Sequence, residues 1–235
     1  MGNVVGIHQP NFMPWLGYFY KITQSDTFIF LDDVQFQKTG ASYINRVNIN
    51  IHGKSNYLTV PVKRVSGLSA INETQFINDR WKKKMIGTLQ GSYGKSKFFK
   101  QNKEFIFELI NYEANNFATY NIHFIENIMK ELSISTKIVT SSDFDITSTS
   151  TERLIELINK VNGTVYLSGS GGDNYQDIKK YEEKNIKLIY NKMPKFEYSQ
   201  INTEEFIGGL SIVDAIFNIG FDDLKNNLFA KIQDD

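Results

Sequence analysis

The chain of 235 residues contains no cysteine. That absence excludes disulfide bonds, thiolate metal sites and a cysteine nucleophile, and it fits a reducing compartment. Histidine is also scarce: His8, His52 and His123 are the only ones, and none has the spacing of an HExxH metal-binding motif. The sequence therefore gives little support to metal chemistry, and we predict no metal site.

Neither sign of charge is in excess, because 26 basic residues balance 26 acidic ones. No overall field would steer the chain to nucleic acid or to a membrane surface, so any such contact must come from a local patch. The sequence also lacks an apolar run of the about 18 residues that a spanning helix needs, and it lacks a signal-peptide pattern. We therefore expect a cytoplasmic protein with no membrane partner.

What the sequence does contain is a regular succession of strand and helix patterns. Short apolar runs predict strands at 4–7, 26–31, 136–140, 164–167 and 186–190. Apolar residues at helical spacing predict helices between the last three strands, at 150–161 and 175–184. This alternation favours right-handed crossovers, so the predicted fold class is α/β, a Rossmann-like and mostly parallel sheet with flanking helices.

A β-hairpin and a helical region complete the predicted fold. Residues 44–51 and 57–62 alternate on either side of a turn at His52-Gly53-Lys54, which is typical of a hairpin. Further helices are predicted at 17–23, 78–91, 96–111, 115–132 and 211–218, the last one ended by Gly220. We expect one domain over residues 1–235, with a helical subdomain of about 65–132 inserted in the α/β core.

The first predicted strand leads directly into His8. Ligands of α/β folds bind at the carboxyl ends of strands, so His8 is expected at that edge, as a general base or as a donor to phosphate. The alternative is a histidine that only bonds to backbone in a tight turn. Asp32 and Asp33 follow the second strand, where a carboxylate could orient the histidine, accept from a ribose or an amine, or bind Mg²⁺. For Asp32 and Asp33 the alternative is a solvated turn. We take His8, Asp32 and Asp33 as catalytic candidates.

Two other segments offer candidate ligand-binding residues. Arg46 lies in the predicted hairpin and is a reasonable ligand for an anion, although an exposed position is nearly as plausible. Residues 168–175 form a glycine-rich loop between a predicted strand and a helix, which would let the backbone approach a diphosphate or a carboxylate. The loop lacks the spacing of a P-loop, of a dinucleotide fingerprint and of a nucleophile elbow.

Residues 80–103 carry eight lysines and arginines and no acid. Four aromatic residues are interleaved with them, namely Trp81, Tyr93, Phe98 and Phe99. Basic and aromatic residues together can grip phosphates and stack bases, so a tRNA could bind to Arg80–Lys103. A solvated helical face is the more usual explanation, and the aromatic residues of this helical region would suit either a homodimer interface or a core.

Taken together, these segments resemble the WbqC-like family from residue 4 to about 220. The ordered motifs that carry the resemblance are HQPNFMPWLGYFYKI, DTFIFLDDVQFQK, NRVNI, YLTVPVK, SSD, TERL, YLSGSGGDNYQD and GLSIVDAIFNIG. The resemblance implies a setting in bacterial surface-polysaccharide (O-antigen) biosynthesis, with transfer of glycine or another acyl group onto an amino sugar. It also points to site residues at His8, Gln9, Pro14, Gly17, Asp32, Asp33, Gln35, Asn45, Arg46, Gly169, Gly171, Gly172 and Tyr175.

We add four residues from the same segments as candidate ligand-binding residues, namely Asn11, Trp15, Tyr18 and Ser168. Trp15 and Tyr18 could provide a stacking surface for a base or a sugar.

The first hypothesis is an acyl- or aminoacyltransferase acting on a nucleotide-linked amino sugar. Its acyl donor would be an acyl-CoA or an aminoacyl-tRNA, and no other cofactor is implied.

Two alternatives remain open. A strand ending in His-x-Pro and a second strand ending in Asp also resemble HxGH-type nucleotidyltransferases and pantothenate synthetases, which would imply ATP and Mg²⁺. Residues 14–18 take the place of that motif here and lack its histidines, so adenylyl transfer is the weaker hypothesis. The other alternative is a non-catalytic protein that binds a nucleotide sugar.

Overall fold

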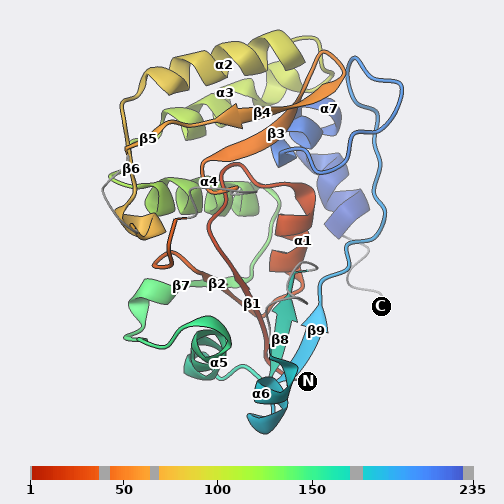
Figure 1. The fold of residues 1–235 in the computed structure, drawn as a ribbon. Helices are drawn as coiled ribbons and strands as arrows, with labels where there is room; N and C mark the ends of the chain where they lie inside the picture. The colour runs from red at the N-terminus through yellow and green to blue at the C-terminus, as the bar shows by residue number, and fades with distance from the viewer. Residues whose placement is uncertain (1, 37–42, 64–68, 170–176, 230–235) are drawn as a thin grey trace.

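The fold is taken from a computed structural model that describes residues 2–36, 43–63, 69–169 and 177–229 (Figure 1). Its centre is a five-stranded sheet with the order β7-β2-β1-β8-β9, in which every neighbouring pair is parallel. The strands are β1 (Val4–His8), β2 (Thr27–Phe30), β7 (Lys137–Thr140), β8 (Val165–Ser168) and β9 (Lys187–Tyr190). The predicted Rossmann-like α/β fold is thereby confirmed.

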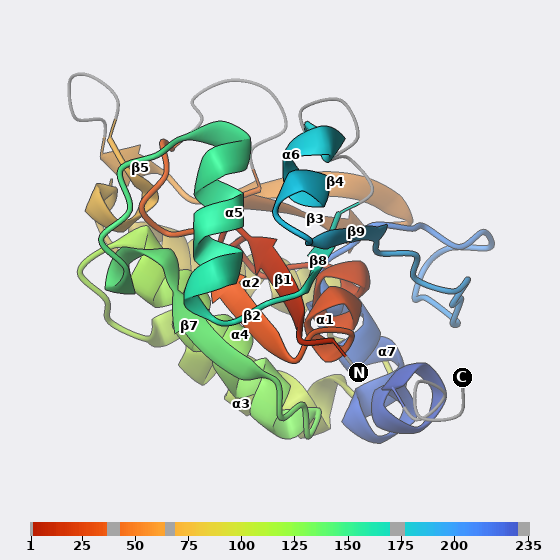
Figure 2. The same ribbon diagram turned by 90° about the horizontal axis from the view of Figure 1, so that it is seen from below.

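Helices cover both faces of the sheet, and the alternation of side chains explains which face each helix meets. Val5 and Ile7 of β1 pack with α5 (Ser150–Lys160) and α6 (Ile178–Glu183) in one apolar cluster. Phe28 and Phe30 of β2 belong to the opposite cluster, with α1 (Leu16–Thr23) and α4 (Phe117–Glu131). Figure 2 shows the sheet between α5 and α6 on one side and α1 on the other.

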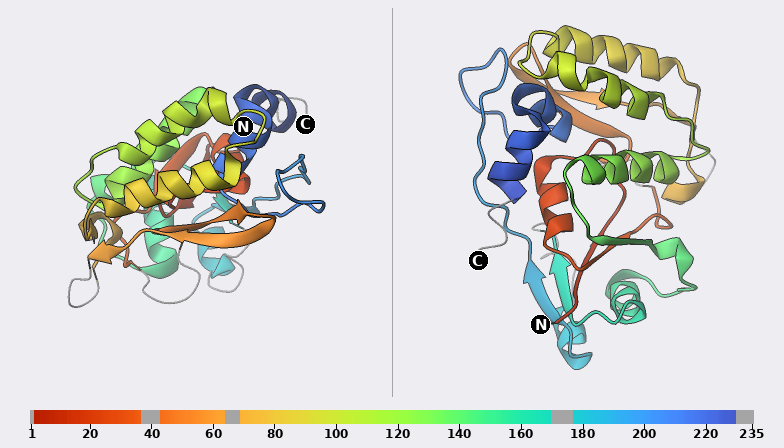
Figure 3. Two further views of the ribbon diagram at one scale, coloured as in Figure 1. Left: turned by 90° about the horizontal axis from the view of Figure 1, so that it is seen from above. Right: turned by 180° about the vertical axis from the view of Figure 1, so that it is seen from behind.

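Most of the remaining elements lie on the side of α1 and α4 that faces away from the sheet (Figure 3). The predicted hairpin is present as β3 (Arg46–Ile51) and β4 (Lys54–Thr59), with His52 and Gly53 at positive φ in the turn. Two short strands pair with each other, β5 (Val62–Lys63) and β6 (Gln75–Phe76). The other helical elements are α2 (Arg80–Tyr93), α3 (Phe99–Asn111), α7 (Ile212–Leu224), the 3₁₀ turns η1 (Ile71–Glu73) and η2 (Ser141–Asp143), and the π-helical turn η4 (Lys225–Phe229).

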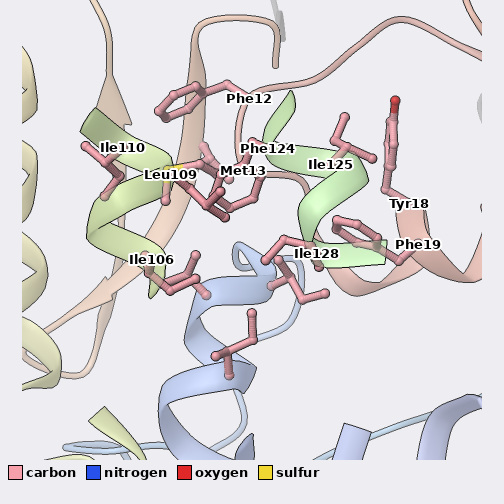
Figure 4. Packing of buried hydrophobic residues seen from close by; sticks show 14 of the residues in the cluster. Phe12, Met13, Tyr18, Phe19, Ile106, Leu109, Ile110, Phe124, Ile125 and Ile128 are labelled. Carbon is pink, nitrogen blue, oxygen red and sulfur yellow. The ribbon is translucent and has the colours of Figure 1, made fainter. Parts of the chain in front are cut away.

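The larger apolar cluster joins the helical middle of the chain to the α/β part. Figure 4 shows side chains of α1, α3 and α4 gathered with Phe12 and Met13, which precede α1. Trp81, Met85 and Leu89 of α2 and Phe217 of α7 belong to the same cluster. The predicted helical segment of about 65–132 therefore shares its core with α1, β2 and α7.

The end of α7 differs from the prediction. Gly220 does not end the helix but makes a kink at φ 80°, after which the chain continues as helix to Leu224. A Cβ at this position would lie 2.9 Å from the ring of Phe98, whose backbone N–H donates to the carbonyl of Phe217. Glycine thus allows both the kink and the close approach of Phe98.

Across the described residues, we find no helix with the length and apolar character that a membrane span requires.

Candidate functional site

A cavity of about 310 Å³ lies where the order of the strands reverses. The chain builds β1, β2 and β7 in one direction and then returns to place β8 and β9 on the other side of β1. Ligands of doubly wound sheets bind at this switch point, outside the carboxyl ends of the strands. His8 ends β1, while Gly169 follows β8 and Asn191 follows β9, and all three line the cavity.

Two further parts of the chain complete the cavity. The start of α1 contributes Trp15, Leu16, Gly17, Tyr18 and Lys21. The opposite wall comes from residues 191–210, which connect β9 to α7 and which we call the wall segment (Figure 1). Its lining residues are mostly apolar or aromatic, namely Met193, Phe196, Tyr198, Phe206, Ile207, Gly209 and Leu210. An apolar cavity with a few polar groups is typical of a small-molecule site.

The hydrogen bond of His8 determines which of its nitrogens is available. Nδ1 lies 3.0 Å from the carbonyl oxygen of Gln9, and a carbonyl can only accept, so Nδ1 carries the proton. Nε2 then has a lone pair and no hydrogen-bond partner among the described residues. Burial, and secondarily the nearby Lys21 cation, lowers the pKa of His8 to about 3. The ring is therefore neutral at pH 7, and the edge-on ring of Tyr18, 4.9 Å away between centroids, helps to hold it in place.

Lys21 is a site residue that sequence reasoning missed. It lies in α1 one turn after Tyr18, lines the cavity and is only 3% exposed. Its Nζ donates to the carbonyl oxygen of Ile7 at 2.7 Å and lies 6.0 Å from the centre of the Phe28 ring. Burial lowers its pKa to about 7. The available signal was a lysine on the apolar face of a short helix, where lysine is almost never fully buried without a partner.

Lys21 makes stability depend on pH. The unfolded chain protonates this amine below pH 10.5, whereas the folded protein protonates it only below about pH 7. The free energy of unfolding should therefore fall as pH falls through this window, by about 1.4 kcal/mol per unit, and then level off. In urea titrations at pH 7 and pH 10, Lys21→Met should lack this contribution, while the exposed control Lys97→Met should match the wild type. An identical pH dependence in Lys21→Met would contradict the assigned burial.

A buried carboxylic acid anchors the wall segment to α7. Asp214 lies in the first turn of α7 and is fully buried, and burial raises its pKa. Its Oδ2 accepts from the hydroxyl of Tyr198 at 2.7 Å and from Nε2 of Gln200 at 2.8 Å. Asn218, one turn later, accepts from the backbone N–H of Ile201. Asp214 was not singled out from the sequence, although an acid inside the apolar run SIVDAIFN was a signal.

Loss of the Tyr198 hydroxyl should loosen this anchor. Tyr198→Phe is expected to lower the free energy of unfolding by about 1–2 kcal/mol, because a buried acceptor on Asp214 loses a donor. Chemical denaturation measures the change. Tyr20→Phe is a suitable control, since the Tyr20 hydroxyl has no hydrogen-bond partner in the described part of the chain. Equal stability of the two variants would show that the hydroxyl of Tyr198 does not hold the wall.

Asp32 and Asp33 lie away from the cavity, at the carboxyl end of β2 next to β7. Asp32 is buried. Its carboxylate accepts from the backbone N–H and hydroxyl of Ser142 and from the amide of Asn72, and its backbone N–H donates to the hydroxyl oxygen of Ser141. Asp33 pairs with Arg153 of α5 and accepts from the hydroxyl of Ser141. The motifs DD, SSD and TERL thus meet in one polar cluster that ties β2 to η2 and α5.

The predicted ligand-binding residues are divided between the cavity and other places. Trp15, Tyr18 and Gly169 line the cavity, and the carbonyl of Gln9 accepts from the hydroxyl of Tyr18 at 2.9 Å. The other described ones do not line it: Ser168 and Asn11 are buried, Asn45 donates to the carbonyl of Val60, Gln35 is exposed, and Arg46 lies 4.7 Å from the Tyr57 ring. Gly171, Gly172 and Tyr175 lie outside the described residues.

The basic segment, residues 80–103, has a buried face and an exposed face in the structure. Trp81, Tyr93 and Phe99 are buried in the core, so they do not form a stacking surface for bases. Lys82 is also buried, where it pairs with Asp79 and donates to the carbonyl of Tyr112. The exposed lysines of this segment are Lys83, Lys84, Lys95, Lys97 and Lys100. A contact with nucleic acid would therefore rest mainly on charge, with Phe98 as the one partly exposed aromatic residue of the four.

Comparison with known proteins places this chain in a family. The sequence model of the WbqC-like protein family matches residues 9–226. The chain is also similar to the uncharacterized protein Rv1507c of Mycobacterium tuberculosis, with 30% identity over 220 residues that cover 92% of this chain and 94% of that protein. No solved structure matches the chain. With the match extending over nearly all of its length, the chain belongs to the WbqC-like protein family.

Proposed function

We propose that the protein is a transferase of bacterial glycan biosynthesis that passes an acyl or aminoacyl group to the amine of a nucleotide-linked amino sugar. The observation that carries the proposal is the position of His8. It lines the cavity at the switch point of the sheet, and its neutral ring offers a free Nε2 lone pair. The resemblance of the motifs to polysaccharide-cluster proteins supports the substrate class.

In the proposed reaction, the sugar amine attacks the carbonyl carbon of the acyl donor and a C–N bond forms. The nitrogen becomes positively charged in the tetrahedral intermediate, and its proton passes to Nε2 of His8. The bond from the acyl carbon to the sulfur of CoA, or to the ribose oxygen of tRNA, then breaks, and the leaving group takes the proton. Trp15 and the aromatic residues of the wall segment would hold the sugar or base against His8.

We assign this role to His8 in preference to Asp32 and Asp33. Both carboxylates have donors or a cation of the protein as partners, and neither lines the cavity. Among the described residues, no heavy atom lies within 4 Å of the position that a Cβ at residue 169 would take, so this part of the chain leaves the backbone of Gly169 open to a diphosphate. The ring of Tyr43 lies 5.4 Å from the ring of Trp15, which lines the cavity. Because Tyr43 is close to Arg46 in the chain, the site could extend from the cavity along the hairpin to Arg46.

Substitution of the exposed lysines in α2 and in the loop that follows it would distinguish between the two possible acyl donors. If the donor is an aminoacyl-tRNA, replacing Lys83, Lys84, Lys95 and Lys97 by glutamate should raise the KM for that donor and make this KM less sensitive to salt. If the donor is an acyl-CoA, the same variant should keep its activity.

The proposal is tested by a thermal-shift screen followed by product analysis. The purified protein is screened with nucleotide-linked amino sugars, acyl-CoAs and ATP with Mg²⁺, and reactions with each donor are analysed by mass spectrometry. We expect stabilisation by a nucleotide-linked amino sugar and a product heavier by one acyl group. Stabilisation by ATP with Mg²⁺ alone would favour a nucleotidyl- or adenylyl-transferring ligase. Binding of the sugar without a product from any donor would indicate a non-catalytic binding protein.

A further inference from the structure

We propose that Lys21 forms an oxyanion subsite next to His8, on the side of the cavity made by α1 and the end of β1, and that this subsite binds a phosphate or carboxylate group of the ligand. The inference deepens the proposed function and rests on it only in placing the ligand in this cavity. It concerns how the ligand is held and does not depend on which group is transferred.

The donors of Lys21 are mostly unused within the protein. A lysine ammonium has three N–H donors, and the structure shows one of them bonded, to the carbonyl oxygen of Ile7 at 2.7 Å. Among the described residues there is no carboxylate within 4.0 Å of Nζ and no second acceptor. Burying a cation without a counter-ion is costly. An oxyanion in the cavity would supply both the counter-ion and the missing acceptors.

The groups that face Lys21 leave the cavity without negative charge. His8 comes from β1, Tyr18 from α1 and Tyr198 from the wall segment, and the described lining includes no aspartate or glutamate. Asp214 lies behind this lining, where its carboxylate accepts from the hydroxyl of Tyr198. The neutral His8 ring carries its proton on Nδ1, so its Nε2 can only accept and the donors for an anion come from Lys21. This set of side chains favours an anion over a neutral or cationic group.

Anion binding at this subsite should be coupled to protonation. Burial lowers the pKa of Lys21 to about 7, and the Lys21 cation further lowers that of His8. An anion next to Nζ would raise both pKa values, since it stabilises the charged forms. At pH 8 most Lys21 side chains of the free protein are neutral, so binding should take up close to one proton. The same anion would make His8 a stronger base for the proposed reaction.

Titration calorimetry at pH 8 tests the subsite, in two buffers of different ionisation enthalpy. The probes are UDP, inorganic pyrophosphate and acetate, with uridine as the uncharged control. We expect an anion to bind the wild type with uptake of close to one proton. Lys21→Met should bind it about tenfold to hundredfold more weakly, as loss of a charge-assisted hydrogen bond implies, and the exposed control Lys160→Met should not differ from the wild type. Pyrophosphate or UDP binding would identify a phosphate group, and acetate binding a carboxylate.

Three results would overturn the inference: no binding of any of the three anions, equal affinity in Lys21→Met, or binding to the wild type without proton uptake. The last measurement needs no variant, so it holds even if Lys21→Met fails to fold. Acyl transfer with an unchanged KM in Lys21→Met would leave the proposed function standing without this subsite. Pyrophosphate binding at Lys21, with no acyl transfer from any donor, would leave the subsite without the proposed function.

Discussion

Replacing His8 by alanine is expected to slow acyl transfer by about a hundredfold to ten-thousandfold, the usual contribution of a general base. The reason is that Nε2 of His8 is a free acceptor in the cavity, and the proton on Nδ1 is fixed by the carbonyl of Gln9. The fold should tolerate the change, because His8 ends its strand and is only partly buried. Steady-state rates with saturating sugar and donor measure the effect.

His52→Asn is the matched control for His8→Ala. His52 is exposed in the hairpin turn at φ 50°, a conformation that asparagine adopts readily, so this variant removes an imidazole without disturbing the turn. It should keep the wild-type rate. If His8→Ala also kept that rate, His8 would be a structural histidine and the proposed proton route would be wrong.

Replacing Asp32 by alanine should lower the free energy of unfolding by about 3 kcal/mol. Two donors would lose their acceptor together, namely the backbone N–H and the hydroxyl of Ser142, and the Asn72 amide would lose its longer contact. These bonds join the end of β2 to η2, and Asp32 is only 5% exposed. Urea denaturation measures the change. Any loss of transferase activity in Asp32→Ala should be no larger than the loss of folded protein explains.

Asp222→Ala provides the comparison, because Asp222 is exposed in α7 and has no side-chain partner among the described residues. Its stability should lie within about 0.5 kcal/mol of the wild type. A fully stable Asp32→Ala protein without activity would return Asp32 to the catalytic role that its position after a strand first indicated.

The positions of His8 and Asp32 show which features of the site can be predicted from the sequence and which cannot. Both residues follow buried strands, and on sequence grounds both belong at the same edge of the sheet. The cavity, however, opens between β1 and β8, on the side of β1 away from β2. The order of strands depends on contacts between distant segments, so local patterns could place His8 at the edge but could not exclude Asp32 from the cavity.

Lys21 and Asp214 were missed for a different reason. Charged residues are normally solvated, so a lysine in a helix and an acid near a helix start are read as surface residues. Only the packing of α1 against β2, and of the wall segment against α7, shows that both are buried. The aromatic residues of α2 mislead in the opposite way. Trp81, Met85 and Leu89 recur at helical spacing and form its inner face, while Lys83 and Lys84 lie outside.

The strands and most helices could be predicted because their apolar residues repeat with the period of each element. Val5 and Ile7 of β1 and Ile155 and Ile158 of α5 follow this rule, and they pack against each other in the structure. The extension of α7 past Gly220 could not be predicted, because a glycine is read locally as a helix end, whereas here it makes a kink that leaves room for the ring of Phe98 from a distant part of the sequence.

The central claim is that the ligand binds beside His8 at the switch point, and the small number of histidines makes this directly measurable. Histidine-labelled protein gives two-bond ¹H–¹⁵N signals from His8, His52 and His123 alone, and the His8→Ala spectrum assigns the first. At pH 7 the account predicts a neutral His8 with its proton on Nδ1. Adding a nucleotide-linked amino sugar should shift the Nε2 signal of His8 and leave the other two histidines unchanged. A bound ligand that shifts His52 or His123 but not His8 would contradict the account.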